Sequence, residues 1–338
     1  MTAHKIGLIG CGWIAPFHVV GLAKIASLHQ VVWVADPNTQ QAAALAAQTG
    51  ARPLADYREG LEEIDCAFVL VPHHLHHSIT LDCLRAGCHV LLEKPMANTL
   101  AEADEMIATA ERVGKTLMIA YPHRYRKGLR LFKQVIESGR YGKLCMLDGL
   151  LDETTDGLPL APWFTKRETL GGGVLFSSSG HLLDIMLWIG GDVHTASMVG
   201  THAGLPMEGE DTAACIIKFQ NGVIGMASDT WASPRVRNWY TMRAMCEKAH
   251  LILTTTDLGN QNTEGANCAW VTRIKAVGKC EEVLFESGEG LDLAPEIEHF
   301  FTCVDTGQTP ETDGVLGRKI MALVFDMYRK ADLDGGNV

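Results

Sequence analysis

The chain has 338 residues, of which 47% are hydrophobic and 20% are charged, and its formal net charge is −11. This length predicts about two domains, and the composition is ordinary for a globular enzyme. The negative balance disfavours nucleic acid and anionic membranes as main partners, but it says little about a small polar substrate.

In the first third, short apolar runs alternate with helical stretches. The runs of strand length lie at residues 5–9, 31–35, 66–71, 89–92 and 116–120, and the helical stretches at 13–28, 40–49, 77–86 and 100–113. Strands that alternate with helices predict a parallel, doubly wound sheet with right-handed crossovers. We expect residues 1–121 to form this α/β domain.

The rest of the chain predicts an α+β domain over residues 122–338. After an amphipathic helix at 127–138, runs at 211–219 and 223–228 flank Asn221-Gly222, a strong hairpin pattern. A large open, mainly antiparallel sheet of about six or more strands follows, one face of which could be buried in a homo-oligomer, a dimer or tetramer. Further strands are expected at 239–245, 250–254 and 270–276, and covering helices at 174–189, 296–306 and 315–330, the last of which could pack back on the first domain.

A glycine fingerprint joins the first predicted strand to the first predicted helix. Gly10 permits a tight turn, Gly12 lets the backbone approach a pyrophosphate, and the small Ala15 allows close packing of helix on strand. The helix start, around Trp13 and Ile14, offers free N–H groups to phosphates. The pattern predicts a dinucleotide site.

Asp36 ends the second predicted strand, where an acid can accept hydrogen bonds from the adenosine ribose and repel a 2′-phosphate. Residues 37–40 contain no Arg or Lys to receive such a phosphate, so NAD is favoured over NADP. The alternative is a solvated turn residue beside Pro37.

Two further segments carry polar side chains at informative places. Lys94, between Glu93 and Pro95, follows the strand predicted at 89–92, at the edge of the sheet where ligands bind. It could hydrogen-bond a substrate hydroxyl, or be a surface lysine paired with Glu93. The glycines at 171–173, a turn that can bring backbone close to a ligand, precede Ser177, His181 and Asp184, whose spacing predicts one shared helix face.

These motifs, together with Ala120-Tyr121-Pro122-His123-Arg124-Tyr125, stand in the order and approximate spacing of the Gfo/Idh/MocA oxidoreductases, a family that the chain resembles over essentially its whole length. The resemblance implies a Rossmann domain, an open-sheet domain and reversible oxidation of a secondary alcohol on a sugar or cyclic polyol. Lys94 would bind the reacting hydroxyl and His181 would be the general base. A cis peptide is common at the position of Pro95.

The resemblance also suggests the remaining contacts. Pro72, His73, His76 and Glu93 would lie at the cofactor. The first three belong to a strand-to-helix loop that in the family runs beside the nicotinamide end, and His76 matches a frequent family histidine. The histidines at 73, 74, 76 and 77 are expected to belong to a loop and a helix start rather than to a metal site. Candidate substrate contacts are Tyr121, His123, Arg124, Tyr125 and Trp163, with Arg235 and Arg237 farther away.

The chain departs from the pattern of family members that act on polyols. They commonly have an Asp four residues before the histidine, where this chain has Ser177. Asp184 could supply part of the missing charge or only bind a neighbouring loop, His181 could be a core histidine, and Ser177 a substrate hydrogen-bond donor or a spacer. Arg124 could clamp a substrate carboxylate or form a structural ion pair.

No apolar stretch reaches the roughly 20 residues of a membrane span, and the N-terminal residues run directly into a strand-length stretch instead of a signal-type segment. Ten cysteines are scattered without a C-x-x-C pair. We therefore expect a cytoplasmic protein with reduced thiols.

Taken together, the residues predict an NAD-dependent dehydrogenase of a sugar, sugar acid or cyclic polyol. The alternatives are a dihydrodiol dehydrogenase, a lyase or hydrolase that oxidises its substrate transiently with tightly held NAD, and a non-catalytic NAD-binding sensor.

Overall fold

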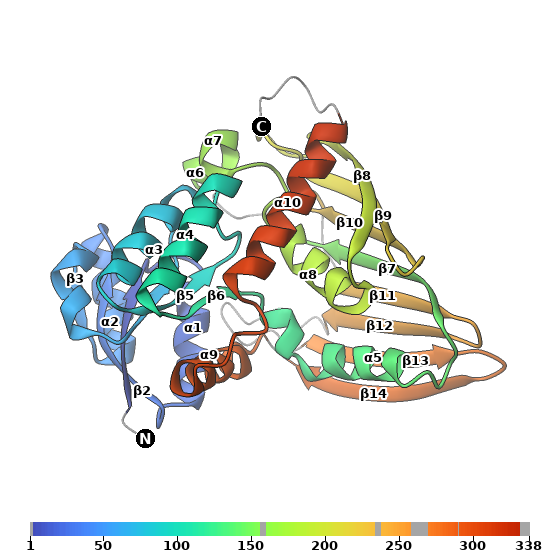
Figure 1. Cartoon of the computed structure of the whole chain (residues 1–338), viewed down its shortest axis with the longest axis horizontal. Helices are drawn as coiled ribbons and strands as arrows, with labels where there is room; N and C mark the ends of the chain where they lie inside the picture. The colour runs from blue at the N-terminus through green and yellow to red at the C-terminus, as the bar shows by residue number, and fades with distance from the viewer. Residues whose placement is uncertain (1–2, 156–159, 234–237, 258–269, 290, 332–338) are drawn as a thin grey trace. The chain divides into compact units, whose positions relative to one another are not determined.

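The computed structural model describes residues 3–155, 160–233, 238–257, 270–289 and 291–331. The chain divides into two compact units. The first joins the residues up to Pro122 to Asp292–Lys319, and the second joins His123–Leu291 to the residues from Ile320 onward. The division falls within the last helix, α10 (Gly314–Ala331), so this helix contributes to both units (Figure 1).

The first unit is built on a six-stranded parallel sheet with the order β3-β2-β1-β4-β5-β6. This is the predicted doubly wound sheet, and its order reverses between β1 and β4, where such folds bind ligands. The short edge strand β3 is an addition, since its three residues are exposed or half-buried and give no apolar run. The strands are β1 (His4–Ile9), β2 (His29–Ala35), β3 (Arg52–Leu54), β4 (Cys66–Val69), β5 (His89–Glu93) and β6 (Leu117–Ala120).

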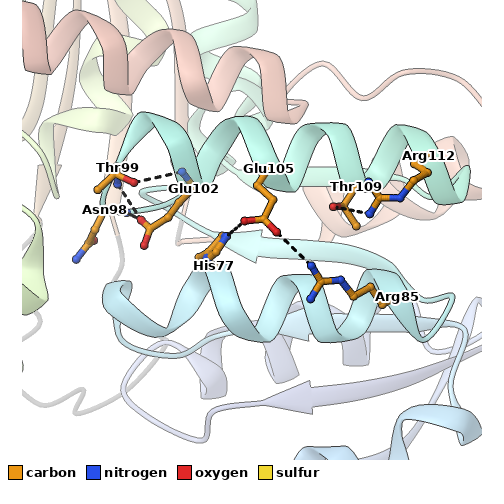
Figure 2. A network of polar contacts seen from close by, with 8 residues as sticks. All are labelled: His77, Arg85, Asn98, Thr99, Glu102, Glu105, Thr109 and Arg112. Atoms are coloured by element: carbon orange, nitrogen blue, oxygen red, sulfur yellow. Dashed lines mark hydrogen bonds and ion pairs between the residues drawn. The ribbon is translucent and has the colours of Figure 1, made fainter.

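Helices connect these strands: α1 (Ala15–Lys24), α2 (Thr39–Thr49), α3 (His76–Arg85) and α4 (Leu100–Val113), with 3₁₀ turns η1 (Tyr57–Glu63) and η2 (His73–Leu75). Figure 2 shows how α3 and α4 are joined, because Glu105 of α4 binds both His77 and Arg85 of α3 at 3.0 and 3.1 Å. The start of α4 is fixed by a capping box between Thr99 and Glu102. The bonds of Glu105 hold α3 against α4.

The expectation that the helix predicted at 296–306 covers the antiparallel sheet is wrong. The helix forms as α9 (Ala294–Thr306), but it belongs to the first unit and packs against α1. Gly21 of α1 permits this approach, since a Cβ there would lie 3.1 Å from the backbone nitrogen of Ala294.

The second unit contains an eight-stranded sheet with the order β14-β13-β12-β11-β7-β10-β9-β8, antiparallel except for the β7–β10 pair. Its strands are β7 (Leu144–Asp152), β8 (Val193–Thr201), β9 (Thr212–Phe219), β10 (Ile224–Thr230), β11 (Asn238–Cys246), β12 (His250–Asp257), β13 (Trp270–Val277) and β14 (Glu281–Glu289). The short η3 (Pro122–Tyr125) leads into α5 (Lys127–Glu137), and α6 (Pro162–Thr165) and α7 (Arg167–Leu170) precede α8 (Ser179–Gly190).

One face of this sheet packs against α5 and α8 (Figure 1). The packing is close, since a Cβ on Gly149 of β7 would lie 2.4 Å from Leu182 of α8. The opposite face exposes apolar side chains, among them Ile216 and Met226, which are partners in the β9–β10 register. None of the helices in the described ranges is long and apolar enough to cross a membrane.

Candidate functional site

The glycine loop after β1 has an open side suited to a phosphate. Gly10 adopts a φ of +96°, and a Cβ there would lie 2.4 Å from the carbonyl oxygen of Leu70, so only glycine fits. A Cβ on Gly12 would meet no atom within 4 Å. The helix that follows has Ile14 as its N-cap, without a side-chain cap in the described structure, and Trp13 beside it is 72% exposed. The space above Gly12 and the uncapped N–H groups fit a dinucleotide pyrophosphate.

Asp36 is tied to this loop. Its Oδ2 accepts a hydrogen bond from the backbone N–H of Cys11 at 2.9 Å, and its Oδ1 accepts one from Asn38 at 2.8 Å. The half-buried carboxylate therefore has a fixed position beside the glycine loop, unlike a freely solvated turn residue. Each oxygen keeps a lone pair for a further donor such as a ribose hydroxyl.

The carboxyl end of β5 holds Lys94 in a constrained turn. Glu93 binds the ring Nε2 of His18 at 2.8 Å and accepts the backbone N–H of Lys94 at 3.3 Å. Burial opposes ionisation of Glu93, but the hydrogen bond and charge of His18 and the charge of Lys94 outweigh it and lower its pKa. The Lys94–Pro95 peptide is cis, as the family resemblance implied. The turn is thus anchored to α1 through an ionised carboxylate.

His76 anchors the same turn from the other side. Its Nδ1 lies 2.7 Å from the carbonyl oxygen of Pro95 and its Nε2 lies 2.9 Å from that of Val71. The ring is fully buried, and burial, more than the other influences on it, lowers the pKa of His76. The ring of His73, the first residue of η2, is 5.6 Å away. His76 therefore links the ends of β4 and β5.

The other histidines of this segment point elsewhere. His77 pairs with Glu105 at 3.0 Å and His74 is exposed. Among the described residues, no three histidine, cysteine or acidic side chains are grouped to hold a metal ion.

In the second unit, Gly172 and Gly173 serve close packing within the protein. A Cβ on Gly173 would lie 2.3 Å from the carbonyl oxygen of Glu210, and one on Gly172 would lie 2.8 Å from the Tyr328 hydroxyl. That hydroxyl accepts the Gly173 N–H at 3.1 Å and donates to Glu210 Oε1 at 2.6 Å. In the described structure, the close approach expected for a ligand is made by Glu210 and Tyr328.

The predicted helix at 174–189 starts later than expected. Helix α8 begins at Ser179, and residues 174–178 form a wide turn in which the Ser179 N–H binds the carbonyl of Val174, five residues back. Ser177 therefore precedes α8, the helix that carries His181 and Asp184. Ser177 is buried in this turn.

The two serines after Ser177 bind groups of the sheet. Ser178 Oγ accepts the indole N–H of Trp231 at 2.7 Å, and Ser179 Oγ donates to Asp229 at 2.8 Å. The indole N–H also lies 3.0 Å from Glu153. These contacts fix the first turn of α8 on β10 and β7.

The imidazole of His181 is stacked on that of His123. The ring centroids are 4.6 Å apart and the planes differ by 9°. His123 in turn meets the rings of Trp239 and Tyr240 edge-on, at 5.0 and 5.3 Å. Tyr240 belongs to a row of buried register partners across the sheet, Thr272, Thr255, Tyr240, Leu151 and Asp229.

Arg124 and Asp184 form an ion pair. Arg124 Nε lies 2.8 Å from both oxygens of Asp184, and an Nη2 contact of 2.7 Å completes the pair. The Asp184 side chain is fully buried, and the guanidinium also faces the ring of Trp188 at 5.5 Å. The structural ion pair, one of the two interpretations of Arg124, is therefore present, and Asp184 binds the η3 segment.

The remaining candidates fall in two groups. Tyr125 lies under Arg130 at 5.2 Å, and Trp163 contacts Phe164, whose ring lies 4.6 Å from Trp231. These residues belong to the second unit with His123 and His181, whereas Tyr121, Lys94 and the cofactor candidates belong to the first. Arg235 and Arg237 lie outside the described residues.

Sequence reasoning missed Asp229, Tyr240 and Trp231. The apolar alternation in β10 places Gly225 and Ala227 inward, and continuing it by two residues places Asp229 inward as well. That pattern could have identified a buried carboxylate.

A doubly wound sheet with an open glycine loop, joined to an open-sheet unit with a buried polar cluster, defines a dinucleotide-dependent oxidoreductase. Residues 4–121 match the family model described as an oxidoreductase family with an NAD-binding Rossmann fold. Residues 129–252 match the GFO/IDH/MocA C-terminal domain. The chain belongs to the GFO/IDH/MocA oxidoreductase family.

The similar proteins include several dehydrogenases and a reductase. The 1,5-anhydro-D-fructose reductase of Ensifer adhaerens is 30% identical over 68% of this chain and 70% of that protein. A 1-carboxy-3-chloro-3,4-dihydroxycyclohexa-1,5-diene dehydrogenase of Comamonas testosteroni is 36% identical over 48% of this chain and 41% of its own length. The WlbA dehydrogenase of Bordetella pertussis, solved with NADH and UDP-GlcNAcA, has a TM-score of 0.80 at 24% identity, with 97% of this chain and 96% of that chain covered. The chain is accordingly a dehydrogenase that acts on CH–OH groups.

Proposed function

We propose that this enzyme reversibly oxidises a secondary hydroxyl of a sugar, sugar acid or cyclic polyol, with NAD preferred over NADP. The fixed carboxylate of Asp36 supports the cofactor preference, because it would meet a 2′-phosphate with like charge. The sugar and cyclic-diol names of the relatives support the substrate class.

Lys94 and His181 are the proposed catalytic residues. The Lys94 ammonium would donate a hydrogen bond to the reacting hydroxyl oxygen, and a ring nitrogen of His181 would take the hydroxyl proton as the C–O bond gains double-bond character. NAD, when bound, accepts the hydride from the same carbon. In the reverse direction His181 returns the proton to the carbonyl oxygen.

One observation carries this proposal: the turn that bears Lys94 is held on both sides. The His18–Glu93 bond and the His76–Pro95 bond fix it at the carboxyl end of β5. Ligands bind at that edge of an open α/β sheet, next to the point where the strand order reverses. A surface lysine would not require such anchoring.

The test is a screen for NADH formation with the purified full chain, NAD or NADP, and panels of sugars, sugar acids, cyclic polyols and dihydrodiols. Turnover with at least one class is expected, and Lys94→Ala and His181→Ala should each lower kcat roughly a hundredfold or more. Absence of turnover with every panel, in both reaction directions, would contradict the proposal. Near-stoichiometric bound cofactor with product but no net NADH would indicate transient oxidation instead.

Ser177, Tyr121, Tyr125 and Trp163 remain proposed substrate contacts. For Arg124 we propose an indirect role: its guanidinium holds the side chain of Asp184 and does not itself clamp a substrate carboxylate.

We also propose that the exposed face of the second sheet joins copies of the chain. Val199, Ile216 and Met226 are 72%, 58% and 43% exposed on neighbouring strands. Ile216→Lys should then lower the mass measured by light scattering, whereas Val315→Lys, at an exposed apolar residue of α10, should not. A cytoplasmic location is proposed because reducing conditions suit the nine free cysteines of the described ranges.

A further inference from the structure

We propose that His123 is the positioning residue for His181: its imidazole sets the plane of the catalytic ring by face-to-face stacking. This inference rests on the proposed role of His181 as general base. The stack is close and nearly parallel, with centroids 4.6 Å apart and 9° between the planes. A ring held in this way cannot turn about its terminal side-chain torsion without leaving the stacked face of its neighbour. That torsion is otherwise broad for histidine.

His123 is itself held rigidly. The residue is 2% exposed, and the rings of Trp239 and Tyr240 meet it edge-on, with planes at 69° and 72° to it. Its carbonyl oxygen accepts the backbone N–H of Arg126 at 3.1 Å, which fixes the backbone just before α5. The His123 ring is therefore held in place by η3, to which it belongs, and by two rings of β11. The His181 ring packs flat against it.

The nearby carboxylates are engaged with other groups. Asp184, one turn along α8 from His181, is bound by the Arg124 guanidinium through contacts of 2.7 to 2.8 Å. Asp229 of β10 accepts the Ser179 hydroxyl at 2.8 Å. Both acids fix the segments that carry the two imidazoles, η3 and the start of α8. The ring-to-ring contact between His123 and His181 restrains the plane of the base relative to those segments.

Orientation matters for proton transfer because the accepting nitrogen must lie within hydrogen-bond distance of the hydroxyl and in line with its O–H bond. A freely turning ring spends only part of its time in that geometry. Loss of the stack should therefore lower kcat more than it raises KM, since the substrate still binds while the base is misaligned.

The test compares two substitutions at His123 in the full chain. His123→Phe keeps a planar ring, so its kcat should stay within about threefold of wild type. His123→Leu keeps an apolar side chain without a ring, so kcat should fall at least tenfold with KM changed less than threefold, and the solvent deuterium isotope effect on kcat should rise as proton transfer limits turnover. In a His181→Ala background, His123→Leu should lower kcat no further. If the leucine variant does not fold, His123→Asn takes its place.

Equal kcat losses in the phenylalanine and leucine variants, or the same loss with and without His181, would overturn the positioning role. These outcomes differ from failure of the proposed function itself. In that case wild type would show no turnover with any substrate, or His181→Ala would keep the wild-type kcat.

Discussion

Removing the cation of the Arg124–Asp184 pair is expected to destabilise the second unit severely. The Asp184 side chain is 0% exposed and that of Arg124 is 8% exposed, with three N···O contacts of 2.7 to 2.8 Å between them. Arg124→Met fills similar space but leaves a buried carboxylate without this partner. Breaking a buried pair from one side costs about 3 to 5 kcal/mol of unfolding free energy, more than the pair itself contributes. The double variant Arg124→Met/Asp184→Leu removes both charges, so it should lie within about 1 kcal/mol of wild type.

Urea denaturation measures these differences. Trp188, whose ring faces Arg124 at 5.5 Å, reports on this region by fluorescence, and far-UV circular dichroism follows the whole chain. The midpoints should shift without a change in slope if the compactness of each state is preserved. A loss below about 1 kcal/mol in Arg124→Met, or an equal loss in the single and double variants, would refute the reasoning. Wild-type stability combined with a raised KM for acidic substrates alone would instead favour a carboxylate clamp.

Four further predictions concern the cofactor loop and the glycine turn. Asp36→Ala should raise the Kd of NAD and lower that of NADP relative to it. An unchanged ratio of the two Kd values in fluorescence titrations would show that Asp36 does not contact the ribose. Gly10→Ala should lower the unfolding free energy by about 2 kcal/mol or more, because of its φ of +96° and the 2.4 Å approach to the Leu70 carbonyl. Gly12→Ala should change the unfolding free energy by no more than about 0.5 kcal/mol but raise the Kd of NAD. Equal losses of unfolding free energy in Gly10→Ala and Gly12→Ala would contradict the open space above Gly12. Burial raises the pKa of Glu210, so its contribution to stability is full below the usual carboxyl pKa and is lost as pH rises through the raised value. Glu210→Gln should therefore flatten the pH dependence of urea midpoints above the usual carboxyl pKa, and an unaltered slope would contradict that assignment.

The parallel sheet of the first unit and its connecting helices could be predicted closely, because local sequence patterns determine these elements. Each buried strand of the parallel sheet is a continuous apolar run, and the glycine loop stands between a strand and a helix, as its chemistry requires. Edge strand β3 lacks such a run. In the second unit, β7, β8 and β14 were not predicted. Polar and apolar residues are mixed in these strands, and their pairing joins segments far apart in the sequence.

The partners of the site residues could not be predicted, because they are set by tertiary packing. The sequence places His181 and Asp184 on one helix, but the ring that stacks on His181 and the guanidinium that binds Asp184 come from η3, 58 and 60 residues earlier. Nothing in the local pattern around Arg124 distinguishes a substrate clamp from an ion pair. The distinction depends on which acid the fold brings to it.

The glycine turn before α8 shows how one pattern can be produced by two different requirements. Backbone approaching a ligand and backbone approaching Glu210 and Tyr328 both exclude a Cβ, so both select glycine at 172 and 173. The structure separates the two through the hydrogen bonds that follow: the Tyr328 hydroxyl joins the Gly173 N–H to the Glu210 carboxylate, and the Leu175 N–H binds the same carboxylate at 3.0 Å. A buried acid at this point satisfies N–H groups that would otherwise be unpaired at the start of a helical segment. The turn therefore fixes where α8 starts, and its glycines are accounted for by packing within the protein.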